Sequence, residues 1–343
     1  MRKWLVASLV AAGLAVHAGP LPGADDKKDP PAKKEQPKKK QNPKYADPAR
    51  VDDPDFKIQG EYVGGEGSTA LGAQVVALGD GKFDVRILDG GLPGAGCDGK
   101  TQRKASAKTE NGKVSFSGKD ISGAIADGTL TLASPEGRSF SLKRVERKSP
   151  TLGQKPPEGA VVLFGGPEDV DKWNGGKIVE LSDGKFLNIG IKSKQKFKDF
   201  KLHVEFRLPY QPYDRGQGRA NSGVYLQDRY EIQVLDSFGL KGENNECGAL
   251  YSFKAPEVNM CLPPLQWQTY DVEFTGARFG ADGARTTAAN VTVYHNGVKV
   301  IDNLAMNHES GAGQKETDQP GPFQLQNHGD PLVYRNIWVV ENK

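Results

Sequence analysis

The sequence predicts an all-β protein. Its 343 residues include 42 glycines without the G-X-Y period of collagen, which favours many turns. Short runs of alternating apolar and polar residues lie between these turn signals, and no segment keeps a helical period. The length favours about two domains, at roughly 100–200 residues for each. The hydrophobic fraction of 36% argues against a membrane transporter and against a wholly disordered chain.

Positive charge is concentrated near the N-terminus. The net charge is +3, but residues 25–44 carry eight lysines against four acidic residues, and Arg2 and Lys3 add two further positive charges. The remainder of the chain therefore has a net charge of about −3. A nucleic-acid-binding domain needs a basic face on its folded body, so we expect no nucleic-acid partner.

Residues 1–18 have the pattern of a secretory signal peptide. Arg2 and Lys3 precede the apolar run Leu5–Val16, and Val16-His17-Ala18 fits a cleavage site. This run is shorter than the roughly 20 residues that a membrane span requires, which disfavours the alternative of an N-terminal anchor. We therefore expect a secreted or periplasmic protein that is not transmembrane after cleavage of the signal.

Residues 19–55 predict a disordered linker that is rich in lysine and proline. The segment has almost no aliphatic residues to bury, so folding would not offset its loss of conformational entropy. We expect its lysines to be solvated. The alternative is contact between the lysine run and an anionic cell surface.

The three cysteines predict no metal site. None of their spacings resembles that of zinc ligands. In an exported protein, Cys247 and Cys261 could close a short loop as a disulfide, which would leave Cys97 alone in another domain.

Residues 56–148 predict a small antiparallel sandwich or barrel. Their short strands are separated by turn signals such as Gly79-Asp80-Gly81 and Asp127-Gly128. The glycine-rich loop Gly90–Gly96 is not followed by a helix, so it is a poor candidate for a phosphate cradle. No catalytic constellation is visible here, and we expect an accessory domain for docking or spacing.

Residues 149–158 predict a second linker, and residues 159–343 a larger β-sandwich. Phe200–Leu208 alternates apolar and polar residues, which predicts a strand with one buried and one wet face. Asn296-Gly297, between two apolar runs, predicts a tight type I′ hairpin turn.

Three strands of this sandwich are predicted to gather polar groups on one face. With Val224, Ile232 and Leu325 facing inward, the alternation turns amides, a carboxylate, an imidazole and a tyrosine outward. The outward residues are Asn221, Tyr225, Gln227, Glu231, Gln233, Gln324, Gln326 and His328. Such a mixture suits sugar hydroxyls, which need paired donors and acceptors. The alternatives are a merely solvated sheet face, a structural role for His328, and a buried salt bridge for Arg335.

A standard glycosidase with two carboxyl groups is disfavoured. Glu231 and Asp236 form the obvious pair, but their odd spacing turns them to opposite faces of a regular strand. The Glu-x-Asp-x-x-Glu arrangement of many sandwich-fold glucanases is also absent.

The region Ala160–Val340 resembles the 3-keto-disaccharide hydrolase family. Several motifs carry the resemblance in order: Val162–Gly166 leading to Trp173, Asp199–Leu202 with Glu205–Arg207, Asn221–Leu226, Tyr230–Asp236, Gly248–Tyr251, Leu325–Gly329 and Tyr334–Ile337. The resemblance implies a concanavalin A-like jelly-roll sandwich that is exported to handle carbohydrate. The sequence departs from the family pattern at Gly165-Gly166, in place of the more usual Asn-Gly, and at apparent insertions over Asp214–Gly218 and Gly280–Arg285.

The family chemistry would explain the missing carboxylate pair. A ketone at C3 acidifies the C2 hydrogen, so one base could remove it, expel the C1 substituent and leave water to add back. If this chemistry holds, our hypothesis makes Glu231 or His328 that base, because both lie on the predicted wet face. The expected sugar-binding set is Asn221, Tyr225, Gln233, Tyr251, Gln326 and Arg335. Asp236 is a candidate either to support Arg335 or to bind a divalent metal such as calcium.

Two other functions remain open at this point. A non-catalytic carbohydrate-binding protein would need the amides and aromatic rings but no titrating base, because fold alone does not fix function. A cell-surface interaction protein would use the lysine-rich linker and the small β domain as docking parts. The expected partner is otherwise a small saccharide or glycan.

Overall fold

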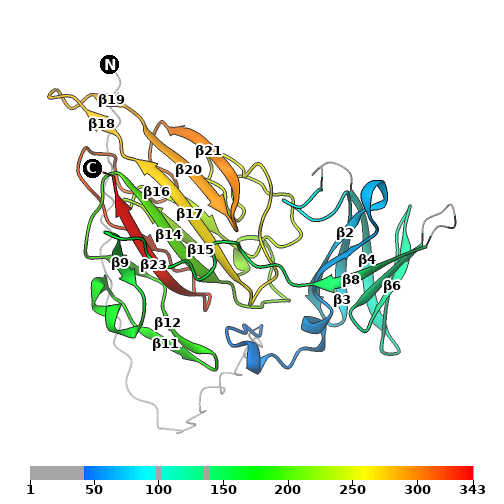
Figure 1. Cartoon of the computed structure of the whole chain (residues 1–343). Coiled ribbons are helices and arrows are strands. Elements are labelled where there is room, and N and C mark those ends of the chain that lie inside the picture. The colour runs from blue at the N-terminus through cyan, green and yellow to red at the C-terminus, as the bar shows by residue number, and fades with distance from the viewer. Residues whose placement is uncertain (1–41, 98–101, 134–136, 138, 343) are drawn as a thin grey trace, which may run out of the picture. The chain divides into compact units, whose positions relative to one another are not determined.

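Antiparallel strands dominate the structure, so the all-β prediction is confirmed (Figure 1). The computed structural model describes residues 42–97, 102–133, 137 and 139–342. The predicted signal peptide and most of the predicted linker, residues 1–41, lie outside the described residues.

The end of the predicted linker has defined structure. Two short 3-10 helices, η1 (Pro48–Arg50) and η2 (Pro54–Lys57), are capped by the side chains of Asp47 and Asp53. Before them, Tyr45 exchanges two backbone hydrogen bonds with Tyr210, of 3.0 and 2.8 Å, and their rings stack. The ordered chain thus begins before the boundary predicted at residue 55, because this aromatic residue has a partner far along the sequence.

Among the described residues, eight antiparallel strands close into a barrel. They are β1 (Gly60–Gly64), β2 (Leu71–Gly79), β3 (Lys82–Asp89), β4 (Gln102–Glu110), β5 (Lys113–Ser117), β6 (Ser122–Ala126), β7 (Thr129–Ala133) and β8 (Ser139–Val145). The barrel closes where β1 pairs with β8, which removes both sheet edges. Inward residues such as Val75, Phe83 and Val85 are fully buried and fill the interior.

The C-terminal part folds as two antiparallel sheets. The smaller has the order β10 (Trp173–Asn174), β13 (Ile191–Ser193), β22 (Gln324–Leu325), β15 (Ser222–Leu226) and β16 (Tyr230–Val234). The larger has the order β11 (Ile178–Leu181), β12 (Gly184–Leu187), β23 (Val333–Glu341), β14 (Phe200–Arg207), β17 (Trp267–Thr275), β20 (Ala289–His295) and β21 (Val298–Met306), with β9 (Val161–Phe164) paired to β23. The predicted Asn296-Gly297 turn joins β20 to β21, and both residues have the positive φ that a type I′ turn requires.

Three smaller elements complete this part of the chain. The 3-10 helices η4 (Pro167–Lys172) and η5 (Gly216–Gly218) lie in loops, as η3 (Gly67–Thr69) does in the barrel. The two-stranded hairpin β18 (Arg278–Phe279) and β19 (Arg285–Thr287) contains the segment Gly280–Arg285, which the sequence marks as an insertion.

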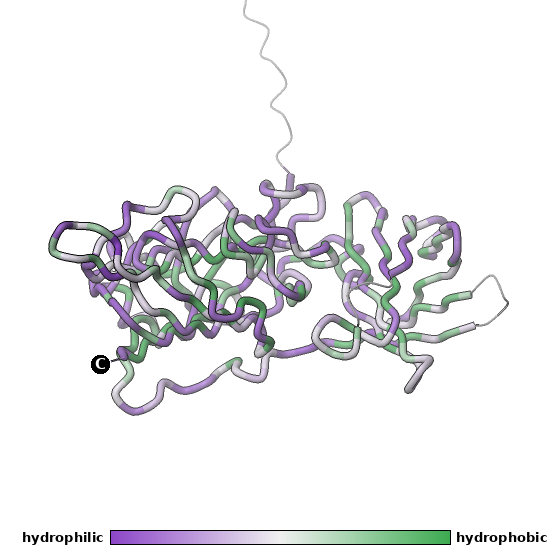
Figure 2. Tube along the Cα trace, turned by 90° about the horizontal axis from the view of Figure 1, so that it is seen from above, coloured by the Kyte–Doolittle hydropathy of each residue, from purple (hydrophilic) through white to green (hydrophobic). Residues whose placement is uncertain are grey.

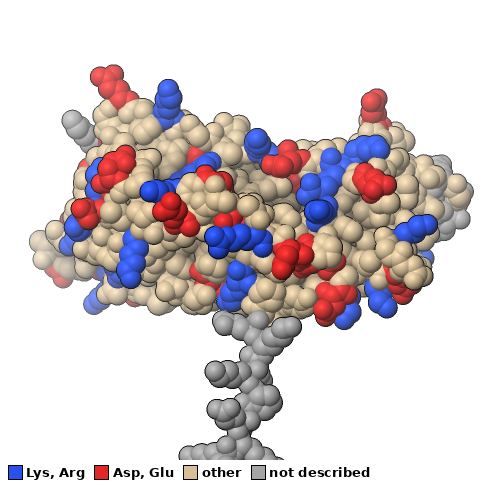
Figure 3. All heavy atoms as spheres, turned by 90° about the horizontal axis from the view of Figure 1, so that it is seen from below, with Lys and Arg blue, Asp and Glu red and all other residues tan. Residues whose placement is uncertain are grey.

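The surface mixes charges of both signs. Hydrophobic and hydrophilic stretches alternate along the trace in Figure 2. On the face that Figure 3 shows, Lys and Arg side chains are interspersed with Asp and Glu. None of the helices in the described part of the chain is long and apolar enough to cross a membrane.

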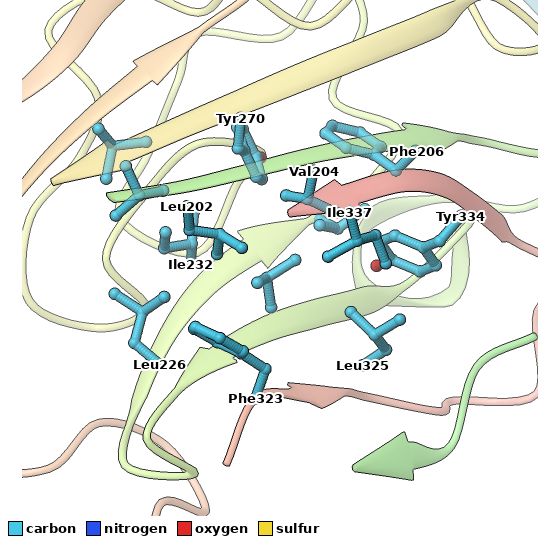
Figure 4. Close-up of a cluster of buried hydrophobic side chains, with 14 of the residues drawn as sticks. Leu202, Val204, Phe206, Leu226, Ile232, Tyr270, Phe323, Leu325, Tyr334 and Ile337 are labelled. Atoms are coloured by element: carbon cyan, nitrogen blue, oxygen red, sulfur yellow. The ribbon is translucent and has the colours of Figure 1, made fainter. Parts of the chain in front are cut away.

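The main core lies between the two sheets of the sandwich. Leu202, Val204 and Phe206 of β14 point toward Leu226, Ile232 and Leu325 of the smaller sheet (Figure 4). Each of these side chains is at most 3% exposed. Burying one such side chain contributes about 1.5–3 kcal/mol, so this layer holds the two sheets together. The inward faces predicted for all three site strands are thereby confirmed.

The outer face of β14 is not wet, contrary to the sequence prediction. His203 and Glu205 are completely buried there, and Arg207 is nearly so. The reason is the segment predicted as a linker, which packs onto this face. Gly153 donates its backbone N–H to Glu205 at 2.5 Å, and Thr151 donates its hydroxyl to Asp271 at 2.6 Å.

Cys247 and Cys261 are buried thiols in the structure, not a disulfide. The Cys247 sulfur lies 3.1 Å from the Tyr270 hydroxyl, and the Cys261 sulfur lies 3.5 Å from the Leu235 carbonyl oxygen. Both thiols therefore sit in the core behind β16.

Replacing Phe206 by Ala should destabilise the protein by about 3–5 kcal/mol, because it removes a fully buried ring that packs against Tyr270 and Tyr334. Chemical denaturation with a tryptophan fluorescence readout measures this loss. Lys201→Ala, at the one exposed position of the same strand, is the matched control and should change stability by less than about 0.5 kcal/mol. Equal effects of the two substitutions would contradict the assigned core.

Candidate active site

A polar pocket of about 430 Å³ lies over the smaller sheet. The residues that line it are Gln217, Asn221, Tyr225, Glu231, Gln233, Tyr251, Gly311, Ala312, Gln326 and His328. The lining contains one carboxylate and one imidazole but no lysine or arginine. Its chemistry suits an uncharged ligand that is rich in hydroxyl groups.

Strand register brings the pocket residues together. Tyr225 pairs with Glu231 across β15 and β16, and Gly223 pairs with Gln233. Because side chains alternate along a strand, Glu231 and Gln233 share the face that the core does not use. Gln326 directly follows β22, which pairs with the other edge of β15, and its backbone N–H donates to Gly223.

Two loops cover this face. The segment around residues 248–251 pairs with β16, where Tyr251 donates its N–H to the Glu231 carbonyl at 3.0 Å. The segment around Ser310 covers the other side, and the Ser310 hydroxyl accepts the Glu231 N–H at 2.6 Å. The face was predicted to be wet. Instead Tyr225, Glu231 and Gln233 are each at most 3% exposed, and they form the floor of a pocket rather than an open surface.

Two glycines make room for the Glu231 carboxylate. A Cβ atom on Gly223 would lie 2.3 Å from Glu231 Oε1. A Cβ atom on Gly311 would lie 2.8 Å from Glu231 Oε2, and Gly311 also has a φ of +55°, which disfavours other residues. The carboxylate is therefore held in a narrow slot in which larger residues would collide with it.

Burial controls the ionisation of Glu231. Desolvation raises the pKa of its carboxyl group to about 7, although the hydrogen bond from the Tyr225 hydroxyl, at 2.8 Å, lowers it. The Tyr225 pKa is raised in turn by burial and by the neighbouring Glu231, so the phenol remains a proton donor. A carboxyl group with these properties can accept or donate a proton near neutral pH.

Amide groups line the rest of the floor. Gln233 Nε2 donates to Gln217 Oε1 at 3.0 Å, and Asn221 Nδ2 donates to the Gln217 carbonyl oxygen at 2.9 Å. The oxygen atoms Gln233 Oε1 and Gln326 Oε1 are buried and have no hydrogen-bond partner among the described residues. Unsatisfied buried acceptors are costly, so these two oxygens are suited to accept hydrogen bonds from ligand hydroxyls.

Seven of the nine residues named from the sequence line this one pocket. They are Asn221, Tyr225, Glu231, Gln233, Tyr251, Gln326 and His328. Of these, Glu231 lies on the buried floor, whereas His328 is exposed on a loop after β22. Their assignment to binding or catalysis is taken up below.

Arg335 lies on the other sheet, away from these residues. Its guanidinium donates to Glu205 at 2.7 Å and stacks 4.0 Å above the Trp267 ring. Burial alone would raise the pKa of Glu205, but hydrogen bonds from His203, Asn336, the Gly153 N–H and Arg335 lower it to about 2. Arg335 thus has the salt-bridge position that the sequence analysis left as its alternative.

Asp236 is committed to a buried ion pair with Arg219, whose Nε lies 2.6 Å from its carboxylate. It does not contact Arg335. Within the described residues, no three or more His, Cys, Asp or Glu side chains gather as metal ligands do, and Asp236, the possible metal ligand, pairs with Arg219 instead.

Sequence reasoning missed Gln217, Gly311 and Ala312. Gln217 lies in the segment Asp214–Gly218, which appears in the sequence only as an insertion without strand pattern. Gly311 lies in a run of small residues, Ser310–Gly313, which is a signal for close backbone approach.

We expect Glu231 to make stability depend on pH. Its folded-state pKa of about 7 lies above the ordinary 4.5, so the native state binds more protons between these pH values. Stability should therefore fall as pH rises from about 4.5 to 7, by roughly 3 kcal/mol relative to Glu231→Gln. Denaturation at a series of pH values measures this difference. Parallel curves for the two proteins would contradict the assigned pKa.

One comparison with known proteins, a family model, agrees with the resemblance seen in the sequence. A family model described as a 3-keto-alpha-glucoside-1,2-lyase-like domain matches residues 159–340. A crystal structure of a candidate glycosyl hydrolase from Parabacteroides distasonis ATCC 8503 is 32% identical, with 54% of this chain and 85% of that chain covered and a TM-score of 0.47. A second, from the same organism, is 18% identical, with 56% and 93% covered and a TM-score of 0.32.

A search among curated proteins finds no significant match. The family model nevertheless spans more than half of the 343 residues and contains all ten residues that line the pocket. Through residues 159–340, the chain belongs to the family of 3-keto-alpha-glucoside-1,2-lyase-like domains.

Proposed function

We propose that the protein cleaves the glycosidic bond of 3-keto-glycosides by elimination followed by hydration. The observation that supports this best is Glu231, a single carboxyl group with a pKa of about 7 on the floor of a polar, uncharged pocket. Among the described residues, no second carboxylate lines that pocket, whereas hydrolysis of an ordinary glycoside by the standard route uses two. Elimination next to a ketone needs only one base.

In the proposed reaction, the Glu231 carboxylate removes the proton from C2, which the C3 ketone acidifies. The electron pair of the C2–H bond forms the enolate, and the bond between C1 and its oxygen then breaks. His328, at the exposed side of the pocket, gives a proton to the departing oxygen. Water then adds to C1 and gives up a proton that restores His328, while Glu231 returns its proton to C2, so the net change is hydrolysis.

The amides would hold the sugar in this reaction. Gln233 Oε1 and Gln326 Oε1 would accept hydrogen bonds from its hydroxyls, because both lack partners among the described residues. Gln326 Nε2, which makes a long hydrogen bond of 3.4 Å to the Tyr225 hydroxyl, would donate its second N–H to the enolate oxygen. Tyr251, which is half-buried at the pocket wall, would give an aromatic surface for the ring.

The direct test is incubation of the purified protein with 3-keto-trehalose and, in parallel, with trehalose. Release of glucose from the keto sugar alone is the expected result. Release from neither substrate by folded protein, or equally from both, would contradict the proposal.

Glu231→Gln should abolish turnover while leaving the fold intact, because the amide fits the same slot but cannot take the proton.

In the wild type, kcat/KM should rise with pH with a midpoint near 7, because the Glu231 carboxyl group must lose its proton to act as the base. Tyr225→Phe should move that midpoint upward, because the lost hydrogen bond stabilises the carboxylate. Gln324→Glu, partly buried on the same sheet face but outside the pocket lining, is a control for altered charge. Full activity of Glu231→Gln would refute the assignment.

A non-catalytic carbohydrate-binding protein is the second candidate, since the same unpartnered amide oxygens would serve a binder. Calorimetry would favour this candidate if it shows sugar affinity without turnover, and if that affinity is retained in both Glu231→Gln and His328→Ala.

We also propose export through residues 1–18. N-terminal sequencing of protein recovered outside the cytoplasm should then begin close to residue 19, and an intact Met1 would contradict export.

A further inference from the structure

The barrel and the sandwich each contribute side chains to the hydrophobic core of the other. Val76 points outward from β2 of the barrel, yet it is only 6% exposed and belongs to the core of the sandwich, with Leu78 packed beside it. In return, Tyr210 and Leu265 from the C-terminal part complete the core of the barrel. Both parts lie in one compact unit, residues 42–343.

This contact depends on a close approach at Gly239. A Cβ atom there would lie 2.5 Å from the Val76 side chain, and the glycine has a φ of +71°. Gly239 lies three residues after Asp236, which itself follows strand β16 of the pocket. The barrel therefore packs against the loop that follows the strand carrying Glu231.

The same strand of the barrel holds the segment 213–219 by polar contacts. Arg219 Nη1 donates to the Ala77 carbonyl oxygen at 3.3 Å, and Arg215 Nη2 donates to the Leu78 carbonyl oxygen at 2.9 Å. The Tyr213 ring lies against Gly79 at the end of β2, and its hydroxyl is 3.2 Å from the Asp80 carboxylate.

This segment also enters the pocket. Gln217 Oε1 accepts hydrogen bonds from Gln233 at 3.0 Å and from Asn221 at 3.3 Å. Gly216 and Gly218 flank Gln217, and no atom lies within 4 Å of a Cβ built on either glycine. A segment with two glycines and such open surroundings has little packing of its own to offset the entropy of ordering it.

We propose that the barrel is a positioning element of the pocket. Strand β2 fixes the segment 213–219 and thereby sets Gln217, which aligns the Asn221 and Gln233 amides for the sugar. This goes beyond the docking or spacing role expected from the sequence. The role in sugar binding rests on the function proposed above, whereas the ordering of the segment does not.

The first test uses the variant Val76→Asp in the full chain, which should weaken the contact between the barrel and the sandwich. The side chain points away from the barrel interior, so the barrel should remain closed while the contact weakens. Thr131→Asp, exposed on β7, is the matched control. Hydrogen–deuterium exchange of residues 213–221 should become at least about tenfold faster in Val76→Asp, and exchange in β6 and β7 should stay unchanged. Unchanged protection of residues 213–221 would overturn the proposal.

The second test uses the double variant Tyr213→Ala with Arg215→Ala. If Val76→Asp does not fold, this test decides whether the barrel positions the segment 213–219. Neither residue lines the pocket. With 3-keto-trehalose, KM should rise about tenfold while kcat stays within about twofold, because the base is untouched. The pH midpoint of kcat/KM should not move in the double variant. The single variant Tyr213→Phe, which keeps the ring on Gly79, should have the wild-type KM. Unchanged KM, or a shifted pH midpoint, would overturn the proposal.

The two tests also distinguish this proposal from the proposed function. If the wild type does not turn over 3-keto-trehalose, the proposed function fails, and hydrogen exchange still decides whether the barrel orders the segment. If the wild type is active and exchange is unchanged in Val76→Asp, the positioning role alone is refuted.

Discussion

The desolvation of one carboxyl group is the constraint on which the rest of the site depends. Glu231 sits between two glycines, Gly223 and Gly311, with the Tyr225 hydroxyl as its hydrogen-bond donor. Burial without a cationic partner keeps its pKa near neutrality. A nearby arginine would remove that property, but Arg335 and Arg219 pair instead with Glu205 and Asp236.

Much of this arrangement follows from strand alternation, which the sequence shows directly. Val224, Ile232 and Leu325 had to face the core, so Tyr225, Glu231 and Gln326 had to face away from it, and register then brought them together. The family resemblance added the jelly-roll sandwich. The all-β class, the two β regions and the Asn296-Gly297 turn were predictable for the same local reasons.

Other features depend on contacts between distant segments, which local pattern does not encode. Arg335 was placed with the sugar-binding residues, but it pairs with Glu205 on the other sheet because β14 and β23 are neighbours. Alternation indicated a wet face for β14 and for the site, and loops cover both. Gln217 reaches the pocket from a segment with no strand pattern, which is held by strand β2 of the barrel, more than a hundred residues earlier in the chain.

The central claim is that a base in this pocket removes the C2 proton, and isotope exchange tests it most directly. The protein would be incubated with 3-keto-trehalose in D2O, and the released 3-keto-glucose analysed by NMR, with 3-keto-glucose alone in D2O as the control for uncatalysed exchange. Elimination and hydration predict deuterium at C2 of the product beyond the control. Full retention of the original hydrogen at C2, with cleavage proceeding, would contradict the account.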